Sequence, residues 1–299
     1  MILIILMYCL VSCAPTSSTG KTPEFYYKDS KIIKLCKAIS RNDEQAVDEL
    51  LQQGVDINAI GKEGMTPLWW AFSLNSKKRF EMVLRKGGNP NIRTKMQYGK
   101  SVMNLAVRHK DVDYLKLALK YGGNPNYQDT EYCTLLYDAI PYHSLEKVKL
   151  LYEAGADINH QDYMGNGLFM HAIGHLYYDV AFFLLEHGYD YTAPLQQYTI
   201  AEIIAGEYQQ RDPNYYLYPY LLKIIDFLES KGVKIDLETP FKVKPVQLKK
   251  ILKPIGSHTR KRVCKKFLNT MVQNQQFIIL LIRSKTEKLK TVLSCGKMV

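Results

Sequence analysis

The sequence lacks the short motifs on which many enzymes depend. It contains no Gly-x-Ser-x-Gly motif and no paired-carboxylate motif. TGKT at 19–22 and YGKS at 98–101 look like the ends of phosphate loops, but a phosphate loop also needs the first glycine of Gly-x-x-x-x-Gly-Lys. Those positions are occupied by Pro15 and Thr94, so backbone amides cannot wrap a phosphate there. We therefore predict that the protein is not an enzyme.

Signals for a bound metal or cofactor are also scarce. The six cysteines include no Cys-x-x-Cys pair, so a zinc site or redox motif has no support. His171 and His175 have the i, i+4 spacing of two metal ligands on one helix, but no carboxylate stands where a His-Glu-x-x-His site has one. We expect both histidines to be structural, and we predict no metal and no cofactor.

Apolar runs long enough to cross a bilayer are absent too. MILIILMYCLVSC, at residues 1–13, is shorter than the roughly 20 residues of a transmembrane helix and has the length of a signal-peptide core. It closes on Leu-Val-Ser-Cys, which resembles a bacterial lipobox with Cys13 as the lipidated residue. The run has no lysine or arginine, so a misassigned start or a buried strand stays an alternative.

Lipidation of Cys13 would anchor the protein in a membrane. Ala14 follows the cysteine, and by resemblance to enterobacterial lipoproteins this favours the periplasmic side of the outer membrane. Residues 14–28, beginning APTSSTGKTPE, are typical of a flexible tether. If the run is not a signal, a cytoplasmic location is the alternative.

Charge is divided unevenly along the chain, whose formal net charge is +11. Residues 1–239 hold 25 Lys/Arg and 28 Asp/Glu, whereas residues 240–299 hold 15 Lys/Arg and one acid, Glu287. The basic character therefore belongs to a tail, 238–299, and does not indicate a specific nucleic-acid binder. The tail could lack fixed structure or be the product of a translated frameshift after a proper terminus near Pro240. It could also contact an anionic lipid through HTRKRVCKK at 258–266, or form an extra element.

A repeated five-residue shape is the strongest signal that is present. It occurs as GVDIN at 54–58, GGNPN at 87–91 and 122–126, GADIN at 155–159, GYDYT at 188–192 and GVKID at 232–236. The leading glycines are 33, 35, 33, 33 and 44 residues apart. A nearly fixed period of this length is typical of a solenoid.

Each period predicts a helix, a turn, a second helix and an extended finger. The glycine follows an apolar-periodic run such as KVKLLYEAG, which is where a helix ends and a left-handed residue is needed. A polar turn comes next, and then segments such as TPLWWAF at 66–72 combine a capping Thr, a Pro in the first turn and a small Ala.

These units resemble the ankyrin repeat, with its Thr-Pro-Leu-His-x-Ala helix and its Gly-Ala-Asp-x-Asn turn. The resemblance covers residues 29–237, about six units, and implies an all-α solenoid with finger loops. The usual histidine is replaced in every unit, by Trp69, Asn104, Tyr137, Met170 and Glu202.

The resemblance also implies a protein partner on the concave face formed by finger tips and inner helices. Carrying the family's contact positions onto this chain gives Met65, Tyr98, Lys100, Arg108, His109, Tyr142, Tyr163, Met164 and His175. Tyr and Arg are common anchors of interfaces, although a chain with 22 tyrosines would place some there in any case.

The longest interval, of 44 residues, indicates an insertion between the last two helices, within 206–222. Tyr208, Tyr215 and Tyr216 stand in this segment. We expect them either to contact a partner, as in an antibody loop, or to cover the exposed end of the solenoid.

Three function classes follow. The first is a lipid-anchored binding module that neutralises a partner, because bacterial ankyrin lipoproteins with this layout include immunity proteins against secreted phospholipase toxins. The second is a general envelope scaffold, and the third is a cytoplasmic or host-directed ankyrin effector.

Overall fold

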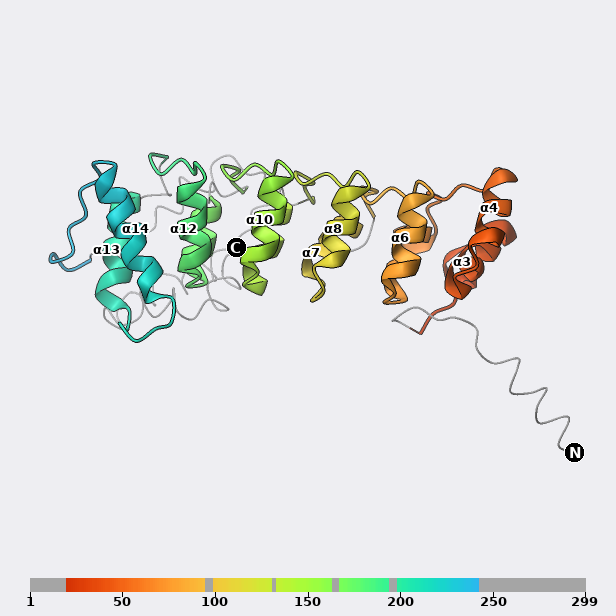
Figure 1. Cartoon of the computed structure of the whole chain (residues 1–299), viewed down its shortest axis with the longest axis horizontal. Helices are drawn as coiled ribbons and strands as arrows, with labels where there is room; N and C mark the ends of the chain where they lie inside the picture. Colours follow the sequence, from red (N-terminus) through yellow and green to blue (C-terminus); the bar gives the residue numbers. More distant parts are fainter. Residues whose placement is uncertain (1–19, 95–98, 131–132, 163–166, 194–197, 242–299) are drawn as a thin grey trace, which may run out of the picture. The chain divides into compact units, whose positions relative to one another are not determined.

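The computed structural model describes residues 20–94, 99–130, 133–162, 167–193 and 198–241. These residues fall into two compact units that divide between Ile158 and Asn159, and each is described by itself. Within the described ranges every regular element is a helix, accompanied by two isolated antiparallel β-bridges, Gln128 with Thr134 and Gln161 with Gly167. The all-α prediction is confirmed (Figure 1).

The first unit contains four helix pairs, preceded by one short helix. Its helices are α2 (Pro23–Tyr26), α3 (Ser30–Arg41), α4 (Glu44–Gln52), η1 (Lys62–Gly64), α5 (Pro67–Ser73), α6 (Lys77–Arg85), α7 (Val102–Arg108), α8 (Asp113–Lys120), α9 (Leu135–Ala139), η2 (Ile140–Tyr142) and α10 (Leu145–Glu153). α3 packs on α5, α5 on α7 and α7 on α9, so the first helices of successive pairs form one row.

The second unit contains two helix pairs. They are α11 (Leu168–Gly174) with α12 (Tyr178–Glu186), and α13 (Ile200–Gln210) with α14 (Tyr218–Ser230). α12 packs on both α11 and α14. The predicted insertion is largely absorbed by longer helices, which leaves residues 211–217 as the loop between α13 and α14. With the first unit, this gives the six expected pairs.

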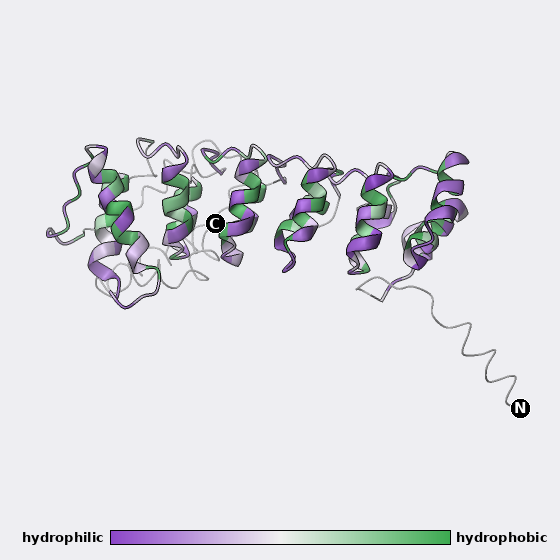
Figure 2. Cartoon of the chain, viewed as in Figure 1, coloured by the Kyte–Doolittle hydropathy of each residue, from purple (hydrophilic) through white to green (hydrophobic). Residues whose placement is uncertain are grey.

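Local sequence explains where the helices begin and end. The Thr66 hydroxyl accepts a hydrogen bond from the amide of Trp69 at 3.1 Å, and Ser101 and Thr199 form capping boxes at the starts of α7 and α13. The leading glycine of every repeat has a positive φ, for example 89° at Gly155, as expected where a helix ends. Figure 2 shows that the helices have distinct polar and apolar faces, and the apolar faces form the core.

In four copies of the five-residue shape the last residue is an asparagine that ties its repeat to the next one. Asn58 donates through Nδ2 to the carbonyl of Gly87 at 3.0 Å, and its Oδ1 accepts from the amide of Asn89 at 2.8 Å. Asn91 and Asn126 do the same in the first unit, and Asn159 does so in the second. We call these four residues the asparagine ladder. It explains physically why the turn sequence recurs.

The first repeats also share a buried polar contact in their core. Trp70 is fully buried, and its indole Nε1 donates to the carbonyl of Cys36 at 3.1 Å and to Ser40 Oγ at 2.9 Å. Both partners lie on α3, whereas Trp70 lies on α5. The contact therefore satisfies a buried donor and fixes α5 against α3.

Candidate functional site

Two of the predicted contact residues are buried. Met65 is 3% exposed, and its carbonyl accepts from the Tyr27 hydroxyl at 2.8 Å. Lys100 is 7% exposed and forms an ion pair with Asp138 at 3.2 Å. Their prediction as exposed contact residues is wrong, because the packing of the preceding segment covers Met65 and the next repeat provides a carboxylate for Lys100.

A charged network in the first unit is centred on Asp138, a residue of α9 that the sequence analysis did not select. Its carboxylate accepts hydrogen bonds from Lys100 Nζ at 3.2 Å, Asn104 Nδ2 at 2.7 Å, and Arg108 Nε at 3.1 Å and Nη2. Asn104 and Asp138 are both buried, whereas the Arg108 side chain is 34% exposed. The network therefore links α7 to α9 below the surface and leaves only the arginine accessible.

His109 lies beside this network, at the end of α7. Its ring is 4.3 Å from the ring of Tyr114, and its Nε2 lies 3.2 Å from Asn75 Oδ1. The buried Lys147 donates through Nζ to the carbonyls of Val107, at 2.7 Å, and His109. Burial lowers the pKa of Lys147, and these carbonyls at the helix end stabilise its ammonium group. His109 is thus largely held within the unit.

The second unit gathers aromatic side chains at the adjoining ends of α11 and α13. The rings of His175 and Tyr177 stack with centroids 5.6 Å apart, and Tyr215 lies 5.0 Å from Tyr216 and 6.0 Å from Tyr178. We call Tyr177, Tyr178, Tyr215 and Tyr216 the tyrosine cluster. Tyr216 is 66% exposed, so the cluster presents a large ring to solvent.

Buried and partly buried polar contacts hold the tyrosine cluster in place. The Tyr178 hydroxyl donates to Glu207 Oε2 at 2.6 Å and accepts from Arg211 Nε at 2.8 Å. Arg211 also bonds Glu207 at 2.7 Å. The Tyr215 hydroxyl donates to the carbonyl of Leu176 at 3.0 Å, and burial raises its pKa to about 12. These contacts fix the loop after α13 against α11 and α12, which preorganises the exposed ring.

The two histidines with metal-ligand spacing, which we expected to be structural, are neighbours in the same region. The rings of His171 and His175 meet edge to face with centroids 5.0 Å apart, and burial lowers the pKa of His175. No group of three or more His, Cys, Asp and Glu side chains that could hold a metal occurs among the described residues. Sequence reasoning found His175, Tyr215 and Tyr216 here but missed Tyr177 and Tyr178, which carry no repeat signature.

Two other predicted contact residues are not members of this cluster. Tyr142 is 54% exposed at the end of η2 in the first unit. Tyr208 lies within α13 with its ring 6.3 Å from that of Tyr218, so it belongs to a helix and not to the expected loop. Cys13, Tyr98, Tyr163 and Met164 lie outside the described residues.

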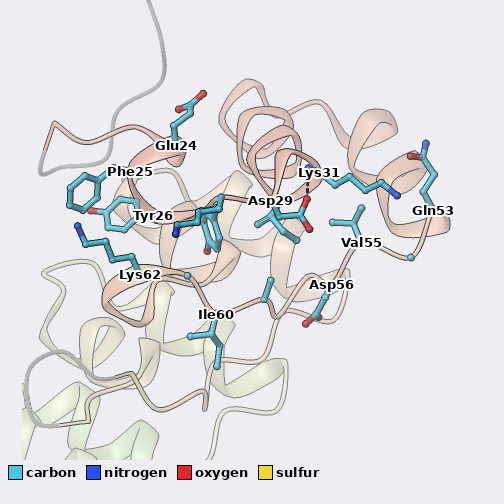
Figure 3. A pocket seen from close by; sticks show the side chains of 16 residues that line it. Glu24, Phe25, Tyr26, Asp29, Lys31, Gln53, Val55, Asp56, Ile60 and Lys62 are labelled. Atoms are coloured by element: carbon cyan, nitrogen blue, oxygen red, sulfur yellow. Dashed lines mark hydrogen bonds between the residues drawn. The ribbon is translucent and has the colours of Figure 1, made fainter.

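The first unit has an open groove that the sequence did not predict. Its volume is about 910 Å³, and it lies between the segment that includes α2 and the turn at 53–62 (Figure 3). Phe25 is 38% exposed and Ile60 is 63% exposed, and the ammonium groups of Lys21 and Lys62 lie 4.0 and 4.1 Å from the Phe25 ring. The groove is therefore a mixed surface of cations, acids and apolar groups.

Across the portion of the chain covered by the structure, no helix has both the length and the apolar character needed to cross a membrane. The expected anchor at Cys13 is not part of that portion.

Stacked helix pairs joined by a repeating turn define a helical repeat protein. Family models match at the sequence level, with ankyrin repeats (3 copies) at residues 80–162 and 103–194 and ankyrin repeats (many copies) at residues 35–84. The chain belongs to the ankyrin-repeat family. This confirms the predicted fold, and ankyrin repeats imply a protein–protein interaction module that is generally non-enzymatic.

Curated relatives with repeats of the same type come from viruses and eukaryotes. The ankyrin repeat protein FPV244 of Fowlpox virus (strain NVSL) is 31% identical over 140 residues, 46% of this chain and 20% of that protein. The ankyrin repeat protein L371 of Acanthamoeba polyphaga mimivirus is 30% identical over 103 residues, 34% of this chain and 13% of that protein. This chain therefore matches a small part of each of these longer proteins.

Proposed function

We propose that this protein binds and sequesters a partner protein, with the tyrosine cluster as a principal contact. The observation that carries the proposal is the combination of a 66% exposed Tyr216 with neighbouring tyrosines that are fixed by hydrogen bonds, buried for Tyr178 and partly buried for Tyr215. Large aromatic rings held rigidly lose little conformational entropy on binding and are common energetic centres of interfaces. Arg108 and Tyr142 supply further accessible side chains in the first unit.

The test begins with the partner, recovered by affinity purification of the full chain and identified by mass spectrometry. The affinity of the purified pair is then measured for wild type, Tyr216→Ala and Leu222→Ala. Leu222 is also exposed, at 41%, on α14 of the same unit, which makes it a matched control. We expect Tyr216→Ala to weaken binding about tenfold or more and Leu222→Ala to leave it unchanged. Equal affinities for all three proteins would show that the tyrosine cluster is not part of the interface.

We further propose that the protein is a lipoprotein that neutralises a lipase-type toxin at the bacterial envelope. It is supported by the Leu-Val-Ser-Cys sequence after an apolar run at the N-terminus and by the layout of signal, tether and repeats. An anchor at Cys13 would raise the local concentration of the binder where such a toxin acts. Incorporation of radiolabelled palmitate into wild type but not into Cys13→Ala is the expected result, and no incorporation into either would exclude the anchor.

A cytoplasmic or host-directed role is the second candidate, and the viral relatives favour it. Ankyrin repeat proteins of a poxvirus and a mimivirus are among the matches. In this alternative the segment 1–13 is not removed, and the protein is recovered whole from a soluble fraction. Determination of the N-terminal residue of the mature protein distinguishes the two roles, because processing at Cys13 would leave that residue first.

A further inference from the structure

The net charge changes sign from the first unit to the second unit and again from the second unit to the tail. Residues 20–158 hold 21 Lys/Arg and 17 Asp/Glu, a net of +4, whereas residues 159–241 hold 4 Lys/Arg and 11 Asp/Glu, a net of −7. Residues 242–299 hold 15 Lys/Arg and one acid, a net of +14. The most basic segment of the chain therefore follows directly after its most acidic part.

The structure fixes the point from which this basic segment departs. The amide of Phe241 donates to Gln209 Oε1 at 2.9 Å, and the Phe241 ring lies 5.6 Å from that of Tyr198. Gln209 Nε2 donates in turn to the carbonyls of Leu237 and Thr239. Residues 242–299 thus begin against α13, which ends at Gln210, immediately before the loop that carries Tyr215 and Tyr216.

The surface at this end of α13 suits a Lys/Arg-rich segment. Asp212 is exposed in the same loop, and Asp179 lies close enough to Tyr177 to contribute to its raised pKa after the larger effects of burial and Tyr216. The nearby cation Arg211 is already engaged by Glu207 and Tyr178. A cation that approaches the tyrosine cluster therefore meets the exposed residue Asp212 and the exposed ring of Tyr216.

Aromatic rings of this unit already accept an ammonium group elsewhere. Lys223 Nζ lies 4.8 Å from the ring centroid of Tyr220 and 5.8 Å from that of Phe182. Such contacts stabilise a cation over a ring at exposed sites. Tyr216, the exposed ring of the tyrosine cluster, offers the same chemistry to a cation from outside the described residues.

We propose that residues 260–266 of the basic tail dock onto the tyrosine cluster and its acidic rim, Asp179 and Asp212, within the same chain. This segment, RKRVCKK, contains five cations in seven residues. The segment follows Phe241 closely in the sequence. At about 3.3 Å per extended residue, the residues between them are still long enough to span several helix lengths. The docked segment covers the surface assigned above to the partner, so it acts as an internal competitor if that assignment holds.

Zero-length carbodiimide cross-linking of the full chain tests this directly, because it joins Lys to Asp or Glu only when they are in contact. A mixture of ¹⁵N-labelled and unlabelled protein distinguishes links within one chain from links between chains. We expect links from Lys261, Lys265 or Lys266 to Asp179 or Asp212 within one chain at low salt. Raising the salt to about 1 M, where the screening length is about 3 Å, should reduce them severalfold.

Three variants make the result specific, and none removes a group that the reagent joins. Arg260→Gln with Arg262→Gln, and separately Tyr216→Ala, should each reduce the links severalfold. Arg283→Gln, a tail arginine outside the docking segment, is the control and should not. Unchanged melting of the helices by circular dichroism shows that each variant is folded, and this readout does not require a partner protein.

Several outcomes would overturn the proposal. They are links only between chains, links spread equally over acids of the first unit, or links unaffected by the Arg260 and Arg262 substitutions. Absence of any link, together with binding of the full chain to phosphatidylglycerol vesicles that the same substitutions abolish, would instead assign the segment to an anionic membrane surface.

Discussion

Replacement of Asp138 by asparagine should destabilise the first unit strongly. The carboxylate is the counterion of Lys100, and their side chains are only 11% and 9% exposed. The substituted amide would keep one acceptor oxygen but would leave the Lys100 ammonium without a negative charge in a poorly solvated position. Removal of one member of a buried ion pair costs about 3–5 kcal/mol, because the other charge is left uncompensated.

The lower end of that range is the better expectation here. Arg108, the second cation that pairs with this carboxylate, is 34% exposed, so water can solvate its guanidinium group when the negative charge is removed. A loss of about 3 kcal/mol corresponds to a fall in melting temperature of roughly 6–12 °C for a folded region of 150–250 residues.

The assay is urea unfolding followed by circular dichroism at pH 7, with Glu146→Gln as the matched control. Glu146 pairs with Lys116 at 3.3 Å, but its side chain is 61% exposed, so its replacement should change the free energy of unfolding by less than about 0.5 kcal/mol. Adding Lys100→Met to Asp138→Asn should recover much of the loss, since the stranded charge is removed. An Asp138→Asn protein as stable as the control would refute the reasoning.

Three further predictions concern the repeats and the cluster. Asn91→Ala should cost about 1–2 kcal/mol of unfolding free energy in urea melts, because the side chain bonds both Gly122 and Asn124; Asn91→Asp, which keeps the acceptor, should cost less. Trp70→Phe should cost about 1–3 kcal/mol in the same assay, since two hydrogen bonds to its buried indole are lost. Burial lowers the pKa of His175, so the unfolded chain takes up a proton at a higher pH than the folded protein does. The contribution of His175 to stability should therefore be complete above about pH 6.5 and should be lost as the pH falls through the lowered pKa of the folded protein. His175→Gln should flatten this pH dependence.

The repeat architecture could be predicted from the sequence because its determinants are local. The leading glycines, such as Gly54 and Gly188, adopt the positive φ that their position after an apolar run predicted. Thr66 and Ser101 cap the helices that they precede. The boundaries proposed at residues 13, 28 and 237 stay predictions.

Side-chain environments could not be predicted in the same way, because they depend on contacts between repeats. Lys100 meets Asp138 from the next repeat, 38 positions away, and no local pattern distinguishes this lysine from an exposed one. Tyr208 lies in a helix because α13 is longer than α5, α7, α9 and α11, the first helices of the four preceding pairs. A family's contact positions thus predict where a residue lies on the backbone, whereas the neighbouring side chains determine whether that residue is exposed to solvent.

The asparagine ladder has a consequence for how such a gene can change in length. The side chain of each ladder residue bonds backbone groups of the repeat that follows it, at positions 29 and 31 residues further on in the case of Asn58. Duplication or loss of one complete period by recombination would place another glycine and another backbone amide at the same two positions. Extra residues outside the turn are also tolerated, because Asn91 makes the same two bonds to Gly122 and Asn124 across 31 and 33 positions. The spacing that must be kept is therefore the one between the leading glycine and the amide two residues after it.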